Sequence, residues 1–210
     1  MDVPAHPASP ALAARDPASV LARLHAQWGA HQDVWVFGYA SLIWRPEFHP
    51  SGEHPALVRG WHRALRMRSR VNRGTPQEPG LVFALLAGGA CRGRVYRLPQ
   101  RDTLGELESL WLREMPNNIY EPRWLAAQTP QGTLPALAFT LSRRSEAWTG
   151  VIDDARMLHI LRHAHGRFGS TLDYLAETAR ALRAHGIHDR EVERLVALAA
   201  RHELLPPFVG

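Results

Sequence analysis

Glu114 is the residue of this sequence best suited to accept a proton. Apolar side chains recur with helical spacing over residues 103–115, and at about 100° per residue they form one stripe. The stripe consists of Leu104, Leu107, Leu110, Trp111 and Met115. Glu114 falls in its middle, and burial raises the pKa of a glutamate toward the range of a general base. Two alternatives stay open: the helix frays before Glu114, or Arg113 or Arg123 pairs with the carboxylate.

A second candidate site, for an anion, follows a short hydrophobic segment. Residues 34–37 are β-branched or aromatic, which is typical of a strand buried on both faces, and small residues then surround Tyr39 over residues 38–41. Where the bulky side chains end the backbone becomes approachable, and exposed N–H groups there can bind a carboxylate or an oxyanion. A tight turn after an ordinary strand is the alternative interpretation.

Three segments resemble, in the same order, motifs of the ChaC-type γ-glutamylcyclotransferases. Residues 36–44 read V-F-G-Y-A-S-L-I-W where the family has V-F-G-Y-G-S-L-I-W. Residues 72–80 contain a stretch similar to the family's R-G-T-P-x-x-P-G, and residues 112–115 resemble the segment that carries its catalytic glutamate. Any one motif alone would be weak, but three in order over most of the chain identify the sequence as a member of this family.

The resemblance implies a reaction whose nucleophile belongs to the substrate. The α-amine of a γ-glutamyl compound attacks its own γ-carbonyl and releases 5-oxoproline, so neither a metal nor another cofactor is required. The enzyme has to fold the glutamyl chain, take a proton from an α-ammonium group whose pKa is about 8, and stabilise an oxyanion. Glutathione, which would also yield Cys-Gly, is the expected substrate, and other γ-glutamyl peptides or amines remain open.

The resemblance also assigns roles to individual residues. Glu114 is expected to act as the base and then as the acid. The N–H groups around Ala40, Ser41 and Leu42 are expected to hold the α-carboxylate or the oxyanion of the substrate. The remaining expected substrate-binding residues are Tyr39, Arg73 and Tyr120. Tyr174, in a late helix, either closes the site from the side or packs in the core.

Ala40 stands where the family has its second glycine. If this position requires a positive φ angle or a very close approach of the backbone, alanine costs about 1 kcal/mol and narrows the pocket, which would alter the affinity for the substrate. We expect activity to be retained. The departure leaves a non-catalytic ligand-binding or interaction domain on the same fold as an alternative function.

Two other arrangements of reactive side chains are weaker. His159 and His163 have the i, i+4 spacing of a metal pair on a helix, but no third ligand is evident, so chance spacing is the preferred interpretation. Ser41 lacks the Gly-x-Ser-x-Gly elbow of a nucleophilic serine. The sequence therefore predicts neither a metal site nor a covalent nucleophile.

The charge of the chain is unusual, because all 25 basic residues are arginine and the net charge is +5. Arg66, Arg68 and Arg70 alternate with apolar residues, which indicates a strand with a basic face. This face is either solvated or attracts an acidic small molecule such as glutathione. Nucleic-acid binding rests on charge alone, and we expect none because no block of five or six like charges occurs.

Composition predicts a cytoplasmic enzyme. A chain of 210 residues that is 45% hydrophobic can bury the core of a single domain. Its one cysteine, Cys91, excludes an intrachain disulfide framework, and no apolar run approaches the ~20 residues of a membrane span. Neither a membrane partner nor a signal peptide is expected, and the oligomeric state stays open.

The elements that would position these residues predict an α+β fold, a small mixed barrel-like sheet covered by helices. Residues 1–16 are expected to be loose, and residues 17–210 to form one catalytic domain whose last third is helical. Strands are expected at about 34–38, 57–71, 80–86, 91–98, 122–128 and 133–141. Helices are expected at about 17–28, 103–115, 153–164, 171–185 and 189–202, with Ser170 and Asp173 forming a capping box.

Overall fold

The computed structural model describes residues 33–115 and 119–206, together with residues 22 and 26. The expected loose segment 1–16 lies outside the described residues, and so does the expected helix at 17–28 apart from residues 22 and 26. The extent of the single domain, 17–210, therefore stays a prediction.

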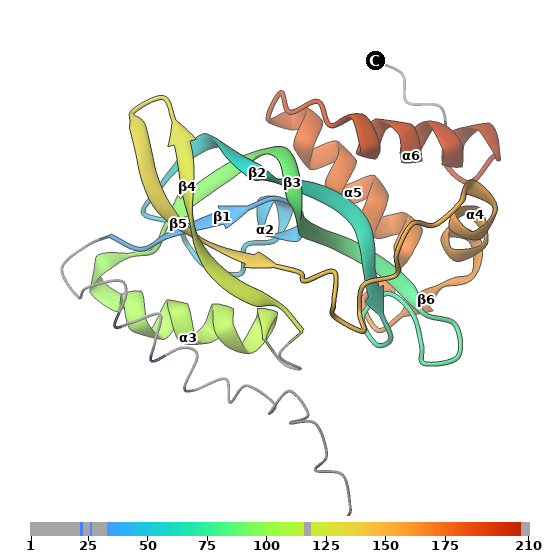
Figure 1. The fold of residues 1–210 in the computed structure, drawn as a ribbon, viewed down its shortest axis with the longest axis horizontal. Coiled ribbons are helices and arrows are strands. Elements are labelled where there is room, and N and C mark those ends of the chain that lie inside the picture. Colours follow the sequence, from blue (N-terminus) through green and yellow to red (C-terminus); the bar gives the residue numbers. More distant parts are fainter. Residues whose placement is uncertain (1–21, 23–25, 27–32, 116–118, 207–210) are drawn as a thin grey trace, which may run out of the picture.

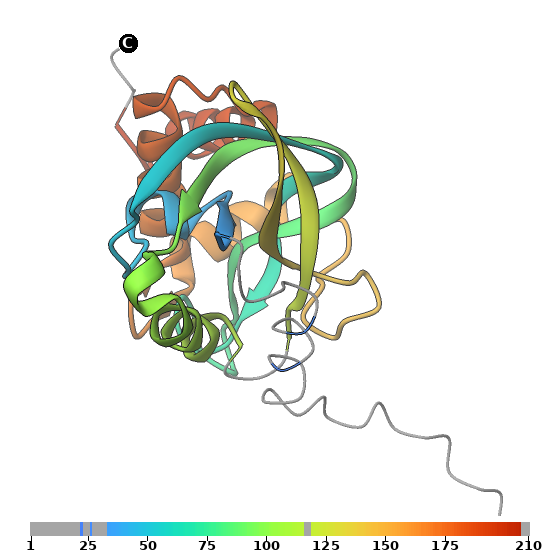
Figure 2. The same ribbon diagram turned by 90° about the vertical axis from the view of Figure 1, so that its left-hand side faces the viewer.

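A closed five-stranded barrel forms the centre of the molecule (Figure 2). Its strands are β1 (Trp35–Gly38), β2 (Gly52–Ser69), β3 (Gly80–Arg97), β4 (Glu121–Thr129) and β5 (Gly132–Thr140). They are hydrogen-bonded in the order β1-β3-β2-β4-β5. The β1–β3, β2–β3, β2–β4 and β4–β5 pairs are antiparallel, whereas β1 meets β5 in parallel and closes the barrel. The sheet is therefore mixed, as predicted.

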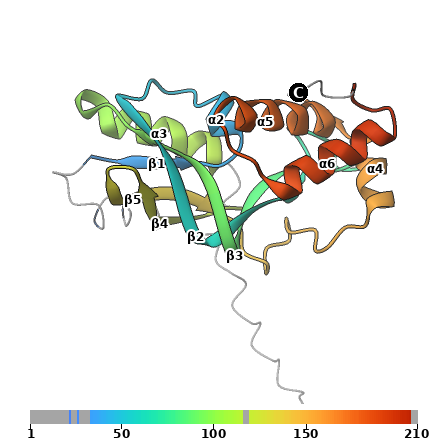
Figure 3. The same ribbon diagram turned by 90° about the horizontal axis from the view of Figure 1, so that it is seen from above.

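Helices cover this barrel in three groups. They are α2 (Ser41–Trp44), the 3₁₀ turn η1 (Gln100–Asp102), α3 (Thr103–Glu114), α4 (Asp154–His163), α5 (Thr171–Ala184) and α6 (Arg190–Arg201). The short strands β6 (His165–Gly166) and β7 (Gly169–Ser170) pair with each other between α4 and α5. Figures 1 and 3 show α3 at one end of the molecule and α4, α5 and α6 toward the other, with α2 between them. None of the described helices combines the length and apolarity that a membrane span needs.

The predicted fold class is confirmed, and the main difference concerns β3. The sequence predicted two strands, at 80–86 and 91–98, with a turn between them. The structure has one continuous strand of 18 residues in which Gly88 and Gly89 have positive φ angles, 103° and 75°. Opposite them the register of β2 shifts at Gly60, whose φ angle is 81°. The glycines therefore form an irregularity that bends the β2–β3 ribbon, not a hairpin turn.

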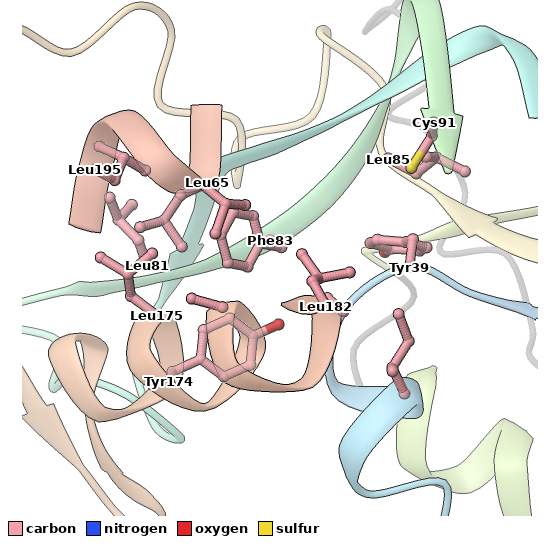
Figure 4. Packing of buried hydrophobic residues seen from close by; sticks show 14 of the residues in the cluster. Tyr39, Leu65, Leu81, Phe83, Leu85, Cys91, Tyr174, Leu175, Leu182 and Leu195 are labelled. Atoms are coloured by element: carbon pink, nitrogen blue, oxygen red, sulfur yellow. The ribbon is translucent and has the colours of Figure 1, made fainter. Parts of the chain in front are cut away.

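The largest apolar cluster fills the space between the barrel and α4, α5 and α6. Figure 4 shows Phe83 of β3 beside Tyr174 of α5, with ring centroids 5.7 Å apart. The predicted capping box of α5 is present, because Ser170 and Asp173 exchange side-chain and backbone hydrogen bonds. One expectation for α3 is wrong: Leu104 is 53% exposed and lies outside the apolar clusters, so only the later turns of this helix are packed.

A buried arginine joins the barrel to the last helix. The side chain of Arg63 on β2 is 0% exposed, and its Nη1 lies 2.6 Å from Oδ2 of Asp189. Its other nitrogens donate to the backbone carbonyls of Tyr39 and Arg92. The second carboxylate oxygen of Asp189 accepts the N–H groups at the start of α6. Asp189 is thus both a helix cap and the counterion of a buried cation.

This double role gives a stability prediction. Asp189→Ala should lower the free energy of unfolding by about 3 kcal/mol, because it leaves Arg63 buried without a counterion. Asp153→Ala is the matched control, since Asp153 caps α4 through the N–H of Arg156 and should cost about 1 kcal/mol. Asp189→Asn keeps a capping oxygen and separates the two effects. Equal losses for the two alanine variants in denaturant titrations would show that the ion pair adds nothing.

Candidate active site

A small hollow lies where α2, α3 and α5 meet the barrel. It encloses about 270 Å³, part of which is open to solvent. Its wall comes from the two residues between β1 and α2, from α2, β3, α3, β5 and α5, and from the approach to β4. The lining residues are Tyr39, Ala40, Ser41, Leu42, Phe83, Glu114, Tyr120, Phe139 and Tyr174. The structure therefore brings together all but one of the site residues predicted from the sequence.

Glu114 is the last residue of α3, and its carboxylate belongs to the wall of this hollow. The side chain is 12% exposed, so the predicted position on the packed face of the helix is confirmed. Burial raises the pKa of this carboxyl group. The guanidinium of Arg113, whose Nε lies 3.1 Å from Oε1 of Glu114, works against that shift, whereas the negative charge of Glu47 adds to it.

The loop that begins α2 faces this carboxylate across the hollow. Because the first N–H groups of a helix have no acceptor within the helix, those of Ser41 and Leu42 remain available to a ligand. The side chain of Ser41 lies between two walls: its Oγ accepts from Nη2 of Arg113 at 3.3 Å, and it lowers the pKa of the Tyr174 hydroxyl against the effect of burial. Behind the loop, Arg63 holds the carbonyl of Tyr39. The loop is thus fixed from both sides.

The φ angle of Ala40 is not one that requires glycine. It is −147°, outside the left-handed region, and the residue is 4% exposed. The cost that a positive φ angle would impose on the alanine therefore does not arise. The methyl group instead forms part of the wall of the hollow.

Three tyrosines surround the carboxylate. The hydroxyl of Tyr39 donates to the carbonyl of Phe139 at 3.0 Å and also interacts with the hydroxyl of Tyr120. Burial raises the pKa of Tyr39 and Tyr120 well above the ordinary value, and it raises the pKa of Tyr174 to about 12. All three hydroxyls are therefore protonated near neutral pH, and Glu114 is the acidic group in this wall that can accept a proton there.

Arg73 is the predicted site residue that the structure does not place in this wall. It is 7% exposed, and its Nη1 donates to the carbonyl of Phe168 at 2.5 Å. Its guanidinium lies 5.1 Å from the ring centroid of Tyr174 and 6.0 Å from that of Trp44. Arg73 thus supports Tyr174 from behind, and its direct contact with a substrate stays a prediction.

The basic strand face also lies away from the hollow. Nη1 of Arg66 donates to the carbonyl of Ile152, and Nη1 of Arg68 donates to that of Glu146. Arg68 lines a separate hollow between β2, β3 and α4, which shares no residue with the first. The structure gives these arginines no contact with the candidate site.

The histidine pair has an ordinary structural environment. Nε2 of His159 lies 3.0 Å from Oε1 of Glu78, and the rings of His159 and His163 are 4.8 Å apart. Within the described part of the chain, no three His, Cys, Asp or Glu side chains are grouped so as to hold a metal ion.

Three residues of the site escaped the sequence analysis as functional candidates. Phe83 and Phe139 line the hollow, yet each lies on a strand whose pattern signals only burial. Arg113 was considered only as a structural partner of Glu114, although it contacts the α2 loop as well. Contacts between distant segments carry no local signal in a single sequence.

Comparison with known proteins decides the family. A model of the family described as "ChaC-like protein" matches residues 34–202, most of the chain. The chain belongs to the ChaC-like family. The resemblance seen in the three sequence motifs is thereby confirmed.

Relatives of this ChaC-like protein carry consistent names. The glutathione-specific gamma-glutamylcyclotransferase of Escherichia coli is 33% identical over 157 residues, which are 74% of this chain and 68% of the relative. Human glutathione-specific gamma-glutamylcyclotransferase 1 is 26% identical over 185 residues, covering 86% and 83%. The crystal structure of the glutathione-specific enzyme from yeast matches with a TM-score of 0.73 at 22% identity, over 86% of this chain and 100% of that one. The structural likeness shows the fold.

Burial of Glu114 predicts how Glu114→Gln will affect the stability of the ChaC-like protein. Because the native pKa is raised, the folded state holds this proton to a higher pH than the unfolded chain does. The free energy of unfolding of the wild type therefore falls as pH rises above about 4.3, whereas the neutral glutamine of the variant brings no such dependence. At about pH 7.5 the variant should melt at the same or a higher temperature than the wild type, with a smaller difference at about pH 4. A variant that melts lower at pH 7.5 would mean that the ion pair with Arg113 stabilises the fold.

Proposed function

We propose that this protein is a γ-glutamylcyclotransferase that converts glutathione into 5-oxoproline and Cys-Gly. The observation that carries the proposal is the position of Glu114: its carboxylate is 12% exposed and shares one hollow with the loop of Ser41 and Leu42. The relatives from E. coli and human are named for this activity and this substrate, which supports the proposal.

The reaction balances without a group from outside the substrate and the chain. The α-ammonium of the glutamyl moiety gives a proton to Glu114, and the free amine attacks the γ-carbonyl, forming the new N–C bond. The tetrahedral intermediate then breaks its bond to the leaving nitrogen, which receives the first proton back from Glu114. The ring nitrogen gives its second proton to the departing amine, so that the lactam is neutral and Cys-Gly leaves with a protonated amino group. One carboxylate thus acts as base and then as acid, and it is restored at the end.

The pKa of Glu114 suits its role as the base. A carboxylate with the ordinary glutamate pKa is a weak base toward an ammonium group whose pKa is about 8. Burial raises the pKa of Glu114, which brings it closer to that value and makes the carboxylate a stronger base than an exposed glutamate.

The opposite wall supplies the groups for binding and charge stabilisation. The N–H groups of Ala40, Ser41 and Leu42 are assigned to the glutamyl α-carboxylate or to the oxyanion that forms on the γ-carbonyl oxygen. The hydroxyls of Tyr39 and Tyr120 flank the carboxylate. That of Tyr120 can donate to the substrate, whereas that of Tyr39 donates to the carbonyl of Phe139 and can only accept. When the glutamyl chain of the substrate is held folded between these walls, its α-amine stays close to its γ-carbonyl in an orientation that allows attack.

The proposed partner of this protein is a small-molecule substrate and neither a nucleic acid nor a membrane. Its proposed location is the cytoplasm. The buried, single Cys91 and the dispersed arginines support this assignment.

We expect the purified protein to release 5-oxoproline and Cys-Gly from reduced glutathione without added metal or nucleotide. The reason is that the base, the nucleophile and the leaving group are all supplied by the chain and the substrate. Chromatography of the products with and without a chelator measures this. Loss of turnover on chelation, recovered by zinc, would show that the pair His159 and His163 had been misjudged.

Glu114→Gln should retain the fold but lower the cyclisation rate by about 10²–10⁴-fold, because an amide cannot accept the proton. Glu114→Asp should also be impaired, since the carboxylate is withdrawn by one methylene from the α-amine. Glu108→Gln is the matched control, because Glu108 is exposed on the same helix. A fully active Glu114→Gln variant would remove this residue from the mechanism.

A further inference from the structure

Arg113 contacts both walls of the candidate active site. Its Nε lies 3.1 Å from Oε1 of Glu114, the proposed base. Its Nη2 donates to Oγ of Ser41 at 3.3 Å, and its Nη1 donates to the carbonyls of Arg45 and Pro46 at 2.5 Å and 3.1 Å. One guanidinium therefore joins the end of α3 to the start and the end of α2.

This arrangement uses the planar fork of arginine. The donors of a guanidinium point in fixed directions, so acceptors bound to different nitrogens are held at fixed positions relative to one another. The side chain of Arg113 is 18% exposed, which limits competition from water. The separation between the Glu114 carboxylate and the Ser41 loop is thus set by one rigid group and not by two independent segments.

We propose that Arg113 is a positioning residue of the cyclisation reaction, which holds the substrate-binding loop of α2 at a working distance from the carboxylate of Glu114. The inference rests on the proposed function for its catalytic consequence. The substrate spans these two walls, with its α-amine at Glu114 and its carboxylate or oxyanion at the loop. A change in their separation therefore acts on the geometry of attack.

Arg113 also bears on the charge of the base. The charged groups facing Glu114 are Arg113 from its own helix and Glu47 from the segment after α2, which has an ion pair with Arg113 at 3.4 Å. The other titratable groups facing it are the neutral hydroxyls of Tyr39, Tyr120 and Tyr174. Arg113 lowers the pKa of Glu114 against the effect of burial, and Glu47 raises it. Removal of the positive charge of Arg113 should therefore raise the pKa of Glu114, and removal of the negative charge of Glu47 should lower it.

Arg113→Gln tests both effects. It should lower kcat by about 10²-fold with a smaller change in KM, because displacement of the loop by about 1 Å spoils the attack geometry. Since Glu114 has to be ionised to accept a proton, the acidic limb of the pH–rate profile should move to higher pH. Glu47→Gln should move that limb to lower pH, a reversal that a general loss of folding would not produce.

Arg113→Lys separates charge from geometry. An ammonium keeps the positive charge beside Glu114 but cannot reach the acceptors of α2 and the carboxylate together. The acidic limb should return toward its wild-type position while kcat stays low. Arg101→Gln is the matched control, because Arg101 is exposed in η1, just before the opposite end of α3, and it should behave as the wild type.

Failure of the proposed function and failure of the inference about Arg113 give different results. The proposed function fails if the wild type yields no 5-oxoproline from glutathione. Even then, the inference requires that the pKa of Glu114, followed by carboxyl NMR, rise in Arg113→Gln and fall in Glu47→Gln. Wild-type kcat and pH profile in Arg113→Gln, or full kcat in Arg113→Lys, would overturn the positioning role. If melting curves show that Arg113→Gln does not fold, the Lys variant and Glu47→Gln decide by the same criteria.

Discussion

The structure depends on keeping one carboxylate out of water while leaving it able to take up a proton. Burial of a charge costs several kcal/mol unless a partner compensates it. Among the described residues Arg113 is the close cation of Glu114, and the negative charge of Glu47 raises the pKa further, so burial is not fully compensated and the pKa stays raised. A cation that compensated the burial fully would have left Glu114 a weaker base. The packing of α3 on the barrel keeps the carboxylate in this environment.

The same constraint explains why segments distant in the sequence meet at one loop. Arg63 on β2 holds the carbonyl of Tyr39 from the barrel side, and Arg113 holds the side chain of Ser41 from the α3 side. Asp189, at the start of α6, supplies the counterion of Arg63. The last helix therefore contributes to the site without touching it. The proposed intramolecular attack requires the loop and Glu114 to keep one separation, and the two arginines contact the loop from opposite sides.

Local patterns in the sequence were sufficient where one element decides the answer. The 3.6-residue period placed Glu114 on the packed face of α3, and the Ser170–Asp173 spacing identified the capping box of α5. Prediction failed where the answer lay on another segment. Two strands were predicted where the structure has only β3, because Gly88 and Gly89 lie opposite the register shift at Gly60 and form a bend in one strand. Arg73 carries a family motif, yet its partners lie about a hundred residues later, and these turn it toward Phe168.

The arginine-only composition takes on a structural meaning at the buried positions. Arg63, Arg73 and Arg113 each donate to backbone carbonyls of segments other than their own. A lysine has a single, strongly hydrated ammonium on a flexible stem, and it cannot reproduce a fork that binds several acceptors in fixed directions. Surface arginines such as Arg194 form exposed ion pairs that a lysine could supply as well. Codon usage can account for the surface, but at the site the guanidinium itself is what the geometry requires.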